Sequence, residues 1–299
     1  MSRKDLDRLL LIEKIKMVEQ ILVIHPQLQE ILDKIDYCRE HAKYALESIG
    51  MLIMGEKGFG KTTIKNIYLE NNPIKRTKTA TVVPVLSIRI PIPATVGGLN
   101  TSLIAALSDP FPRGGTIPQR TQRVYELVDK CKVEICFFDE FQHFAERESF
   151  KLNRTVSDWT KNFMGDTGLP LILLATPKAA EILNGIENEQ LGRRFPFRIT
   201  LQPFGWDTEK QRENFRKFLE KVDEKLPLPM HSNLADPEMA ARIHYATGGV
   251  MFEIMRLIRG AAVFALRRNL PKVDVYLLKE SFNEYLATNS PKLKNPFRE

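Results

Sequence analysis

The sequence predicts an α/β protein in which a parallel sheet carries helices on both faces and has helical segments before and after it. Two patterns support this. Between residues 50 and 175, four short apolar runs alternate with amphipathic stretches. Outside that region, apolar residues recur at helical spacing. We therefore expect four parts, listed in chain order: an N-terminal helical segment at 1–47, an α/β core at 48–203, a C-terminal helical domain at 204–290 and a tail at 291–299.

The N-terminal segment is expected to form two helices. Apolar residues recur three and four positions apart from Leu9 to Leu22, and again from Leu28 to Ile35. Pro26 interrupts the pattern between the two runs, and proline is poorly tolerated inside a helix.

The apolar runs of the core are expected to be strands. They cover 50–55, 82–90, 133–138 and 169–175. Continuous apolar runs of this length are typical of parallel strands that are buried on both faces. The stretches between them that we expect to be helical are 62–69, 99–107, 121–130 and 159–164.

The C-terminal domain is expected to contain four helices. Their apolar patterns cover 207–224, 237–246, 252–268 and 275–286, and prolines or glycines separate them. The tail at 291–299 contains two prolines and alternating charges, which predicts a mobile segment.

Composition excludes several classes of protein. With 43% hydrophobic and 27% charged residues among 299, the chain is typical of a globular protein rather than a collagenous or disordered one. No apolar run approaches the roughly 18 residues of a membrane helix, and charges interrupt the N-terminus where a secretory signal would be apolar. These features predict a cytoplasmic protein with no membrane partner.

Charge and cysteine content add weaker indications. The chain has 44 Lys and Arg against 37 Asp and Glu, a net charge of +7, which favours nucleic-acid binding only if the basic residues share a face. Cys38, Cys131 and Cys136 lack the paired spacing of a zinc site, so we expect reduced thiols.

A phosphate-binding loop follows the first predicted strand. Residues 55–62 read Gly-Glu-Lys-Gly-Phe-Gly-Lys-Thr and match G-x-x-x-x-G-K-[ST] at every fixed position. In such a loop, backbone N–H groups at a helix N-terminus surround an anion. Lys61 is expected to contact the outer phosphates and Thr62 to bind Mg²⁺. The expected ATP-binding residues are Gly55, Glu56, Lys57, Gly58, Phe59, Gly60, Lys61, Thr62 and Thr63.

A carboxylate pair follows the third predicted strand. Asp139 is placed to hold Mg²⁺ together with Thr62, and Glu140 is placed to activate a water molecule. The alternative for an isolated Asp-Glu pair is a solvated turn. Together with the phosphate loop, the pair predicts magnesium-dependent ATP hydrolysis.

Three further segments carry a resemblance. They are Phe-Asp-Glu-Phe-Gln-His-Phe at 138–144, Leu-Leu-Ala-Thr-Pro at 173–177 and Asn-Glu-Gln-Leu-Gly-Arg-Arg-Phe at 188–195. With the phosphate motifs, they make the chain resemble AAA+ ATPases, and more narrowly the TniB/TnsC family of transposition regulators, over about residues 20–285. The resemblance implies an AAA+ P-loop core whose C-terminal helices form a lid.

The resemblance also implies roles for four residues near the nucleotide. Thr176 would be the sensor that contacts water or the γ-phosphate; the alternative is that it only starts the turn before Pro177. Arg194, or else Arg193, would reach the nucleotide of a neighbouring subunit, the alternative being a solvated basic turn. Glu253 stands where many AAA+ proteins have a sensor arginine in the lid, so Arg256, one turn later, is the candidate replacement.

Finally, the resemblance implies partners. They are duplex DNA bound without sequence preference, further copies of the chain in a ring or helical filament, a DDE-type transposase and a TniQ-like target-selection protein. The candidate phosphate contacts in a Gly/Pro-rich loop and the helix after it are Arg113, Thr116, Arg120 and Arg123, with the loop at 94–100 as a second site.

Four functions remain open from the sequence. The leading hypothesis is an ATP-driven switch that assembles on target DNA, recruits transposase and disassembles on hydrolysis. A helicase loader or replication initiator of the same superfamily is the closest alternative. A small-molecule kinase is less consistent with Glu140 directly after Asp139, and a non-hydrolysing scaffold is disfavoured by the presence of Glu140.

Overall fold

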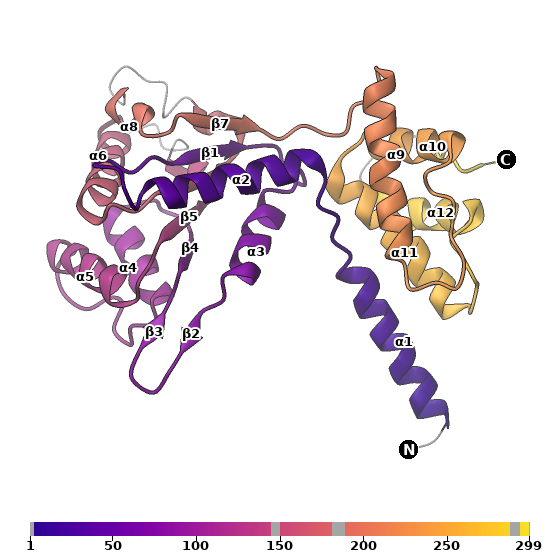
Figure 1. The fold of residues 1–299 in the computed structure, drawn as a ribbon, viewed down its shortest axis with the longest axis horizontal. Coiled ribbons are helices and arrows are strands. Elements are labelled where there is room, and N and C mark those ends of the chain that lie inside the picture. The colour runs from indigo at the N-terminus through magenta and orange to yellow at the C-terminus, as the bar shows by residue number, and fades with distance from the viewer. Residues whose placement is uncertain (1–2, 145–149, 181–188, 288–293, 299) are drawn as a thin grey trace. The chain divides into compact units, whose positions relative to one another are not determined.

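The computed structural model describes residues 3–144, 150–180, 189–287 and 294–298. The chain forms two compact units, each with its own core (Figure 1). One unit is Pro26–Leu201, and the other combines Met1–His25 with Gln202–Glu299.

The first unit is built on a five-stranded parallel sheet with the order β4-β5-β6-β1-β7. The strands are β1 (Met51–Met54), β4 (Val85–Arg89), β5 (Ile135–Asp139), β6 (Leu171–Ala175) and β7 (Phe197–Thr200). Of the first four, β1, β4 and β6 lie within the apolar runs that predicted them, and β5 extends one residue beyond its run, to Asp139. The edge strand β7 was not expected from the sequence, because its side chains alternate between half-buried and exposed instead of forming an apolar run.

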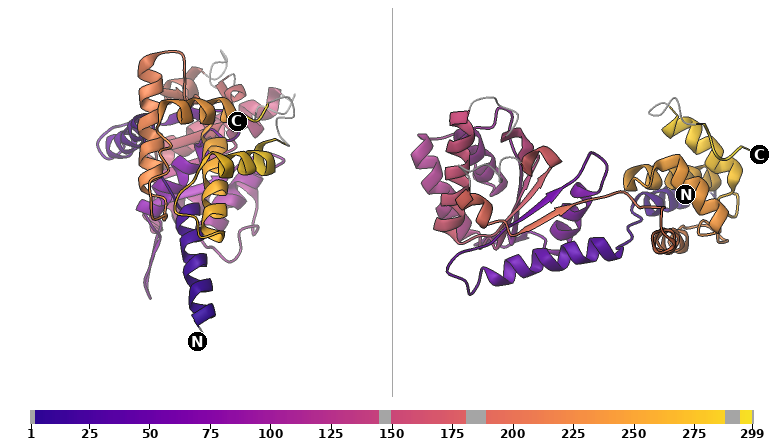
Figure 2. Two further views of the ribbon diagram at one scale, coloured as in Figure 1. Left: turned by 90° about the vertical axis from the view of Figure 1, so that its right-hand side faces the viewer. Right: turned by 90° about the horizontal axis from the view of Figure 1, so that it is seen from above.

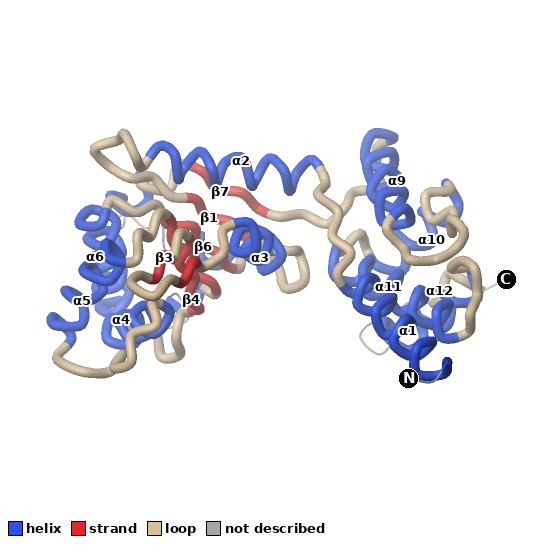
Figure 3. Tube along the Cα trace, turned by 60° about the horizontal axis from the view of Figure 1, so that its bottom comes forward, coloured by secondary structure: helices blue, strands red, loops and turns tan. Residues whose placement is uncertain are grey.

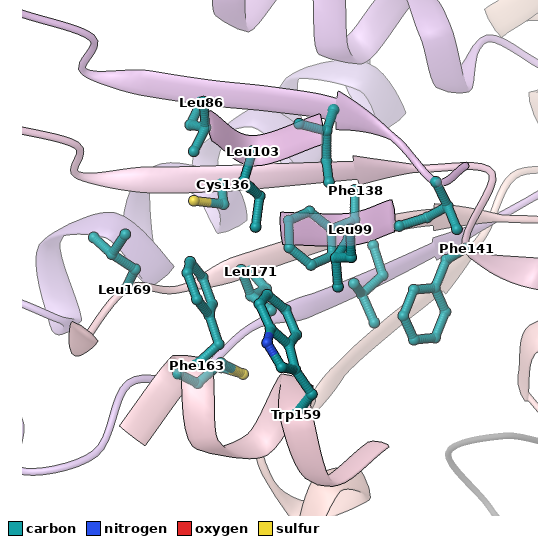
Figure 4. Packing of buried hydrophobic residues seen from close by; sticks show 14 of the residues in the cluster. Leu86, Leu99, Leu103, Cys136, Phe138, Phe141, Trp159, Phe163, Leu169 and Leu171 are labelled. Carbon is teal, nitrogen blue, oxygen red and sulfur yellow. The ribbon is translucent and has the colours of Figure 1, made fainter. Parts of the chain in front are cut away.

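Helices cover both faces of this sheet (Figure 3). They are α2 (Pro26–His41), α3 (Lys61–Asn71), α4 (Val96–Ala106), α5 (Ile117–Lys130) and α6 (Phe150–Thr167). Neighbouring residues of β5 pack against helices on opposite faces of the sheet. Phe137 contacts Tyr68 of α3, with 5.4 Å between the ring centroids. Phe138, on the opposite face, contacts Trp159 and Phe163 of α6 at 6.5 and 6.2 Å (Figure 4). The expected α/β architecture with helices on both faces is confirmed.

Short elements complete this unit. Strands β2 (Lys75–Arg76) and β3 (Thr81–Val82) form an antiparallel hairpin that the sequence did not predict. Single turns of 3₁₀-helix, η1 (Phe141–Phe144) and η2 (Pro177–Ala179), follow β5 and β6. A short helix, α8 (Glu189–Arg193), precedes β7.

The second unit is helical (Figure 2). It contains α1 (Arg3–Glu19), α9 (Glu209–Glu224), α10 (Pro237–Thr247), α11 (Met251–Arg267), α12 (Val275–Ser281) and a π-helical turn η4 (Phe282–Leu286). Its core includes Val18 and Ile21 from the N-terminal part of the chain. The N-terminal segment expected at 1–47 is thus divided, with α1 in the helical unit and α2 on the sheet.

The C-terminal residues 294–298 are packed, which corrects the expectation of a mobile tail for this part. Phe297 is 1% exposed and belongs to the helical core, and the Asn295 amide donates to the Lys279 carbonyl at 3.1 Å. An aromatic side chain with room in an apolar core outweighs the local proline and charge pattern. The rest of the expected tail, 291–293 and 299, lies outside the described residues.

No helix in the described part of the chain is both long and apolar enough to cross a bilayer.

Candidate nucleotide-binding site

The phosphate loop joins β1 to α3, as the sequence predicted. The N–H of Gly55 donates to the carbonyl of Ala175 at 3.1 Å, which ties the start of the loop to the end of β6. Gly58 and Gly60 have φ values of 88° and 99°, a conformation that side-chain-bearing residues rarely adopt. Gly60 is the N-cap of α3, and a Cβ there would meet no atom within 4 Å from the described residues beyond its own chain neighbours and helix backbone. The loop therefore offers open backbone at a helix N-terminus, as anion binding requires.

Lys61 lies across this loop. Its Nζ donates to the carbonyl oxygens of Gly55 at 2.5 Å and Glu56 at 3.0 Å. Burial lowers the pKa of Lys61, although the carboxylates of Glu140 and Asp139 act in the opposite direction. The cation of the loop thus lies close to the acidic pair that follows β5.

Asp139 is the last residue of β5 and is 8% exposed. Its Oδ2 forms an ion pair with Nζ of Lys65 at 2.5 Å, and its Oδ1 accepts from the N–H of Glu140 at 3.0 Å. Lys65 was missed in the sequence reasoning. The available signal was its position one helical turn after Lys61, which places it on the same face of α3.

The residues present suit the group that the phosphate motif implies. Thr62 and Thr63 are exposed in the first turn of α3, and Asp139 already has a cation beside it. Hydroxyl and carboxylate oxygens are ligands that Mg²⁺ prefers. Bound MgATP would supply the electrophilic phosphorus and its charge-neutralising ion; the chain would supply the loop amides, Lys61 and the acidic pair.

Thr176 lies directly after β6, and β6 lies beside β5 as expected for a sensor. Its N–H donates to Oε1 of Gln142 at 3.1 Å. The Nε2 of Gln142 donates in turn to Oε2 of Glu140. The ends of β5 and β6 are therefore joined through a glutamine side chain, a contact that spacing in the sequence does not reveal.

The two candidate arginines differ in placement. Arg193 is exposed, whereas the side chain of Arg194 is only 15% exposed and lies 3.7 Å from Glu47. Nη1 of Arg194 is buried without a hydrogen-bond partner in the described residues, and its backbone carbonyl accepts from the N–H of Gly50 at 2.6 Å. The geometry thus favours Arg193 over Arg194 as the side chain presented at the surface.

Arg256 lies in α11 of the helical unit. Its guanidinium is 5.9 Å from the ring centroid of Phe252 and 5.7 Å from that of Tyr285. These contacts favour a packing role within the unit. A sensor role for Arg256 stays a prediction.

The candidate DNA contacts are also unequal. Arg120 donates to the Gly97 carbonyl at 3.2 Å and to Thr101 Oγ1 at 2.8 Å, which fastens α5 to α4. Arg123 forms an ion pair with Asp109 at 2.6 Å. Arg120 and Arg123 therefore form hydrogen bonds and an ion pair within the chain. Phosphate contacts were expected to face solvent instead.

The other two candidates lie at the surface. Arg113 is exposed in the loop before α5. Thr116 is exposed too, and its Oγ1 caps α5 by accepting from the N–H of Gln119 at 3.4 Å. The DNA hypothesis therefore rests mainly on this loop.

Comparison with solved structures agrees with the architecture. The chain is similar to the Aeropyrum pernix ORC1 protein, solved in complex with DNA, at a TM-score of 0.61 and 16% identity over 89% of this chain and 66% of that one. It is similar to Cdc6p from Pyrobaculum aerophilum at a TM-score of 0.62 and 16% identity, over 87% and 68%. It is similar to the RuvB branch-migration motor of Thermotoga maritima at a TM-score of 0.51 and 12% identity, over 86% of this chain and 68% of that one.

At these identities the comparison establishes the fold, that of AAA+ ATPases. The chain spans about two thirds of the length of these neighbours. No curated protein matches the chain.

A family model supplies a more specific relationship. The family described as "Bacterial TniB protein" matches residues 14–205, which include the phosphate loop, the acidic pair, Thr176 and both arginines. The chain is a P-loop ATPase that belongs to the TniB family.

Proposed function

We propose that the protein is an ATP-dependent regulator of DNA transposition that binds duplex DNA without sequence preference. In its ATP-bound form it assembles into an oligomer on target DNA and recruits a DDE-type transposase and a TniQ-like target-selection protein. Hydrolysis of ATP then dismantles the assembly. The observation that carries this proposal is the TniB match over a complete phosphate site.

The site supports the hydrolytic part. Lys61 and the loop amides bind the phosphates, and Thr62 with Asp139 holds Mg²⁺. Glu140 accepts a proton from the attacking water, whose oxygen bonds to the γ-phosphorus as the bond to the bridging oxygen of ADP breaks. Thr176 is adjacent to Glu140 through Gln142, which supports its sensor role.

Charge supports the DNA part. The net charge of +7 favours a polyanionic partner. Arg113 lies in an exposed loop with two glycines and no acidic residue between 110 and 120, which suits contacts to phosphates rather than to bases. The helical unit is proposed to act as the lid over the nucleotide of the α/β unit.

A replication initiator or helicase loader is the second candidate, because the ORC1 and Cdc6p structures share the fold. Copurification with a transposase rather than with a replicative helicase would separate the two. The family match favours transposase.

The central test is fluorescence anisotropy of a labelled random-sequence duplex with no nucleotide, with ADP and with a slowly hydrolysed ATP analogue. We expect cooperative binding only with the analogue and none for Lys61→Ala. Lys34→Ala, which removes a half-buried lysine from α2, is the control and should bind normally. Binding that is absent, or equal in all three nucleotide states, would overturn the proposal.

The same titration repeated over a salt series tests the loop. Arg113→Ala should weaken binding and reduce the slope of log K against log salt by about 0.9, the value for one phosphate contact. An unchanged slope would show that Arg113 does not contact a DNA phosphate.

A further inference from the structure

The ends of strands β5 and β6 are bridged by one buried amide. Gln142 is the second residue of η1 and is 5% exposed. Its Nε2 donates to the Glu140 carboxylate, and its Oε1 accepts from the N–H of Thr176 at 3.1 Å. A primary amide is the side-chain group of this length that donates and accepts at once, so both contacts depend on glutamine chemistry.

Glu140 stands on a strained turn. Its φ of 60° lies in the left-handed region, which a residue with a side chain adopts only when its surroundings enforce it. The surroundings here are η1: the Glu140 carbonyl accepts from the N–H of His143 at 3.0 Å, and the rings of Phe141 and Phe144 pack edge-to-face at 5.1 Å. Figure 4 shows Phe141 in the apolar core. The backbone direction of Glu140 is thus set by the core, which leaves its carboxylate to be held by side-chain contacts.

Two side chains of the described residues hold that carboxylate, and they differ in kind. Arg89, at the end of β4, lies 3.9 Å from Oε1, but its side chain is 72% exposed. An exposed pair at that distance is screened by water and restricts geometry little. Gln142 is buried and donates a directed hydrogen bond to the other carboxylate oxygen. It is the contact that defines orientation.

We propose that Gln142 is a positioning residue for ATP hydrolysis. Its amide holds the Glu140 carboxylate in one orientation and ties that orientation to the strand end where Thr176 lies. The inference rests on the proposed function, in which Glu140 takes the proton from water. Gln142 contributes through Glu140 and not through nucleotide binding, because its amide contacts Glu140 and the Thr176 backbone, neither of which belongs to the phosphate loop at 55–62.

The test compares ATP hydrolysis by the full-length chain, with DNA present, for wild type, Gln142→Leu and Gln142→Asn. Leucine removes the amide at similar size, and asparagine keeps the amide but is one carbon too short to reach both partners. We expect kcat to fall about tenfold or more in both, because small misplacements of a catalytic group have effects of that size. Affinity for a fluorescent ATP analogue should stay within about twofold of wild type.

A double variant separates positioning from a structural role. If Gln142 acts through Glu140, then Glu140→Gln with Gln142→Leu should hydrolyse ATP no more slowly than Glu140→Gln alone. The matched control is Gln122→Leu, which removes an exposed amide that donates to Glu126 on α5 at 3.3 Å and should leave kcat unchanged.

Each outcome decides between explanations. An unchanged kcat in Gln142→Leu, a parallel loss of nucleotide affinity, or a further loss in the double variant would overturn the inference. If Gln142→Leu does not fold, Gln142→Asn carries the same comparison. If wild type and Glu140→Gln hydrolyse ATP equally, it is the proposed function that fails, and that result is recognised before Gln142 is considered.

Discussion

At the scale of single residues, the Lys65–Asp139 pair is the least expected feature of the nucleotide site. Both side chains are mostly buried, at 17% and 11% exposure. A cation at this place neutralises Asp139 when Mg²⁺ is not bound there.

We therefore predict that Lys65→Met destabilises the protein in EDTA by about 3 kcal/mol, because a largely buried carboxylate loses its counter-ion. Mg²⁺ with an ATP analogue should recover much of the difference. Thermal unfolding in the two buffers measures both effects, and Lys34→Met, which breaks an exposed pair with Glu30, should cost only about 0.5 kcal/mol. Equal melting of Lys65→Met and wild type in EDTA would contradict this role.

The neighbouring arginines should have separable functions. Arg193→Ala is expected to lose ATPase activity about 1,000-fold, because an arginine acting between subunits stabilises the transition state. Arg194→Ala is expected to lower the melting temperature instead, since its side chain is mostly buried beside Glu47.

Mixing provides the decisive control for Arg193. A mixture of Arg193→Ala with Glu140→Gln should recover activity that neither has alone, because each supplies the group that the other lacks and both keep the phosphate loop. Failure to recover it would mean that Arg193 does not act on a neighbouring subunit.

His25 provides a pH-dependent contact in the helical unit. Its ring packs against Phe204 and Phe218 at centroid distances of 5.4 and 6.3 Å, and burial lowers its pKa. As the pH falls below 6.5, the unfolded chain takes up a proton before the folded chain does, so the free energy of unfolding decreases. Chemical denaturation at pH 7.5 and 5.5 should show this decrease in wild type and less of it in His25→Phe.

At the scale of elements, the turn between α10 and α11 fixes how the chain enters the helical unit. The N–H of Phe204 donates to the Gly249 carbonyl at 2.9 Å. A Cβ at Gly249 would lie 2.2 Å from the Phe204 carbonyl oxygen, and the φ of Gly249 is 71°. Both the close approach and the backbone angle therefore require glycine.

Gly249→Ala is accordingly expected to destabilise the helical unit by about 2 kcal/mol or more, through steric overlap added to backbone strain. Gly248→Ala is a matched comparison, because Gly248 has a φ of 58° but, in the described part of the chain, a Cβ there would meet no atom within 4 Å beyond its chain neighbours. This substitution should lower the free energy of unfolding only by the backbone strain, about 1 kcal/mol. Urea denaturation measures both, and an equal effect of the two substitutions would show that the contact with Phe204 does not matter.

At the scale of the whole molecule, two separate cores predict two unfolding transitions. The phosphate loop and the acidic pair belong to the α/β unit alone. An ATP analogue at 100 times its Kd should stabilise that unit by about 2.7 kcal/mol and leave the other transition in place. Calorimetry with and without the analogue tests this. An equal rise in the temperatures of both transitions would contradict this expectation and would instead support Arg256 as a nucleotide contact.

Local chemistry explains which features could be predicted from the sequence. Buried parallel strands require apolar runs, so four of the five strands of the parallel sheet were recognised. The phosphate loop and the Asp139–Glu140 pair were recognised because their chemistry needs particular residues at short spacing. These features depend on neighbours along the chain, and the family resemblance followed from them.

The remaining features depend on contacts between distant segments. Strand β7 is an edge strand that half-buries its side chains, α1 packs with helices more than 200 residues away, and Phe297 fills a core that its local sequence does not announce. In the site, Gln142 and Lys65 gained their roles only when β5, β6 and α3 came together.

The sequence by itself thus determined the class of fold, the family and the chemistry of the phosphate site, because those are written in short-range patterns of residue type. Only the tertiary structure decided which unit α1 joins, which arginine is exposed and which groups hold the catalytic carboxylate. Burial and hydrogen-bond partners are properties of the packed chain, and two arginines adjacent in sequence have the same chemistry until packing buries one and exposes the other.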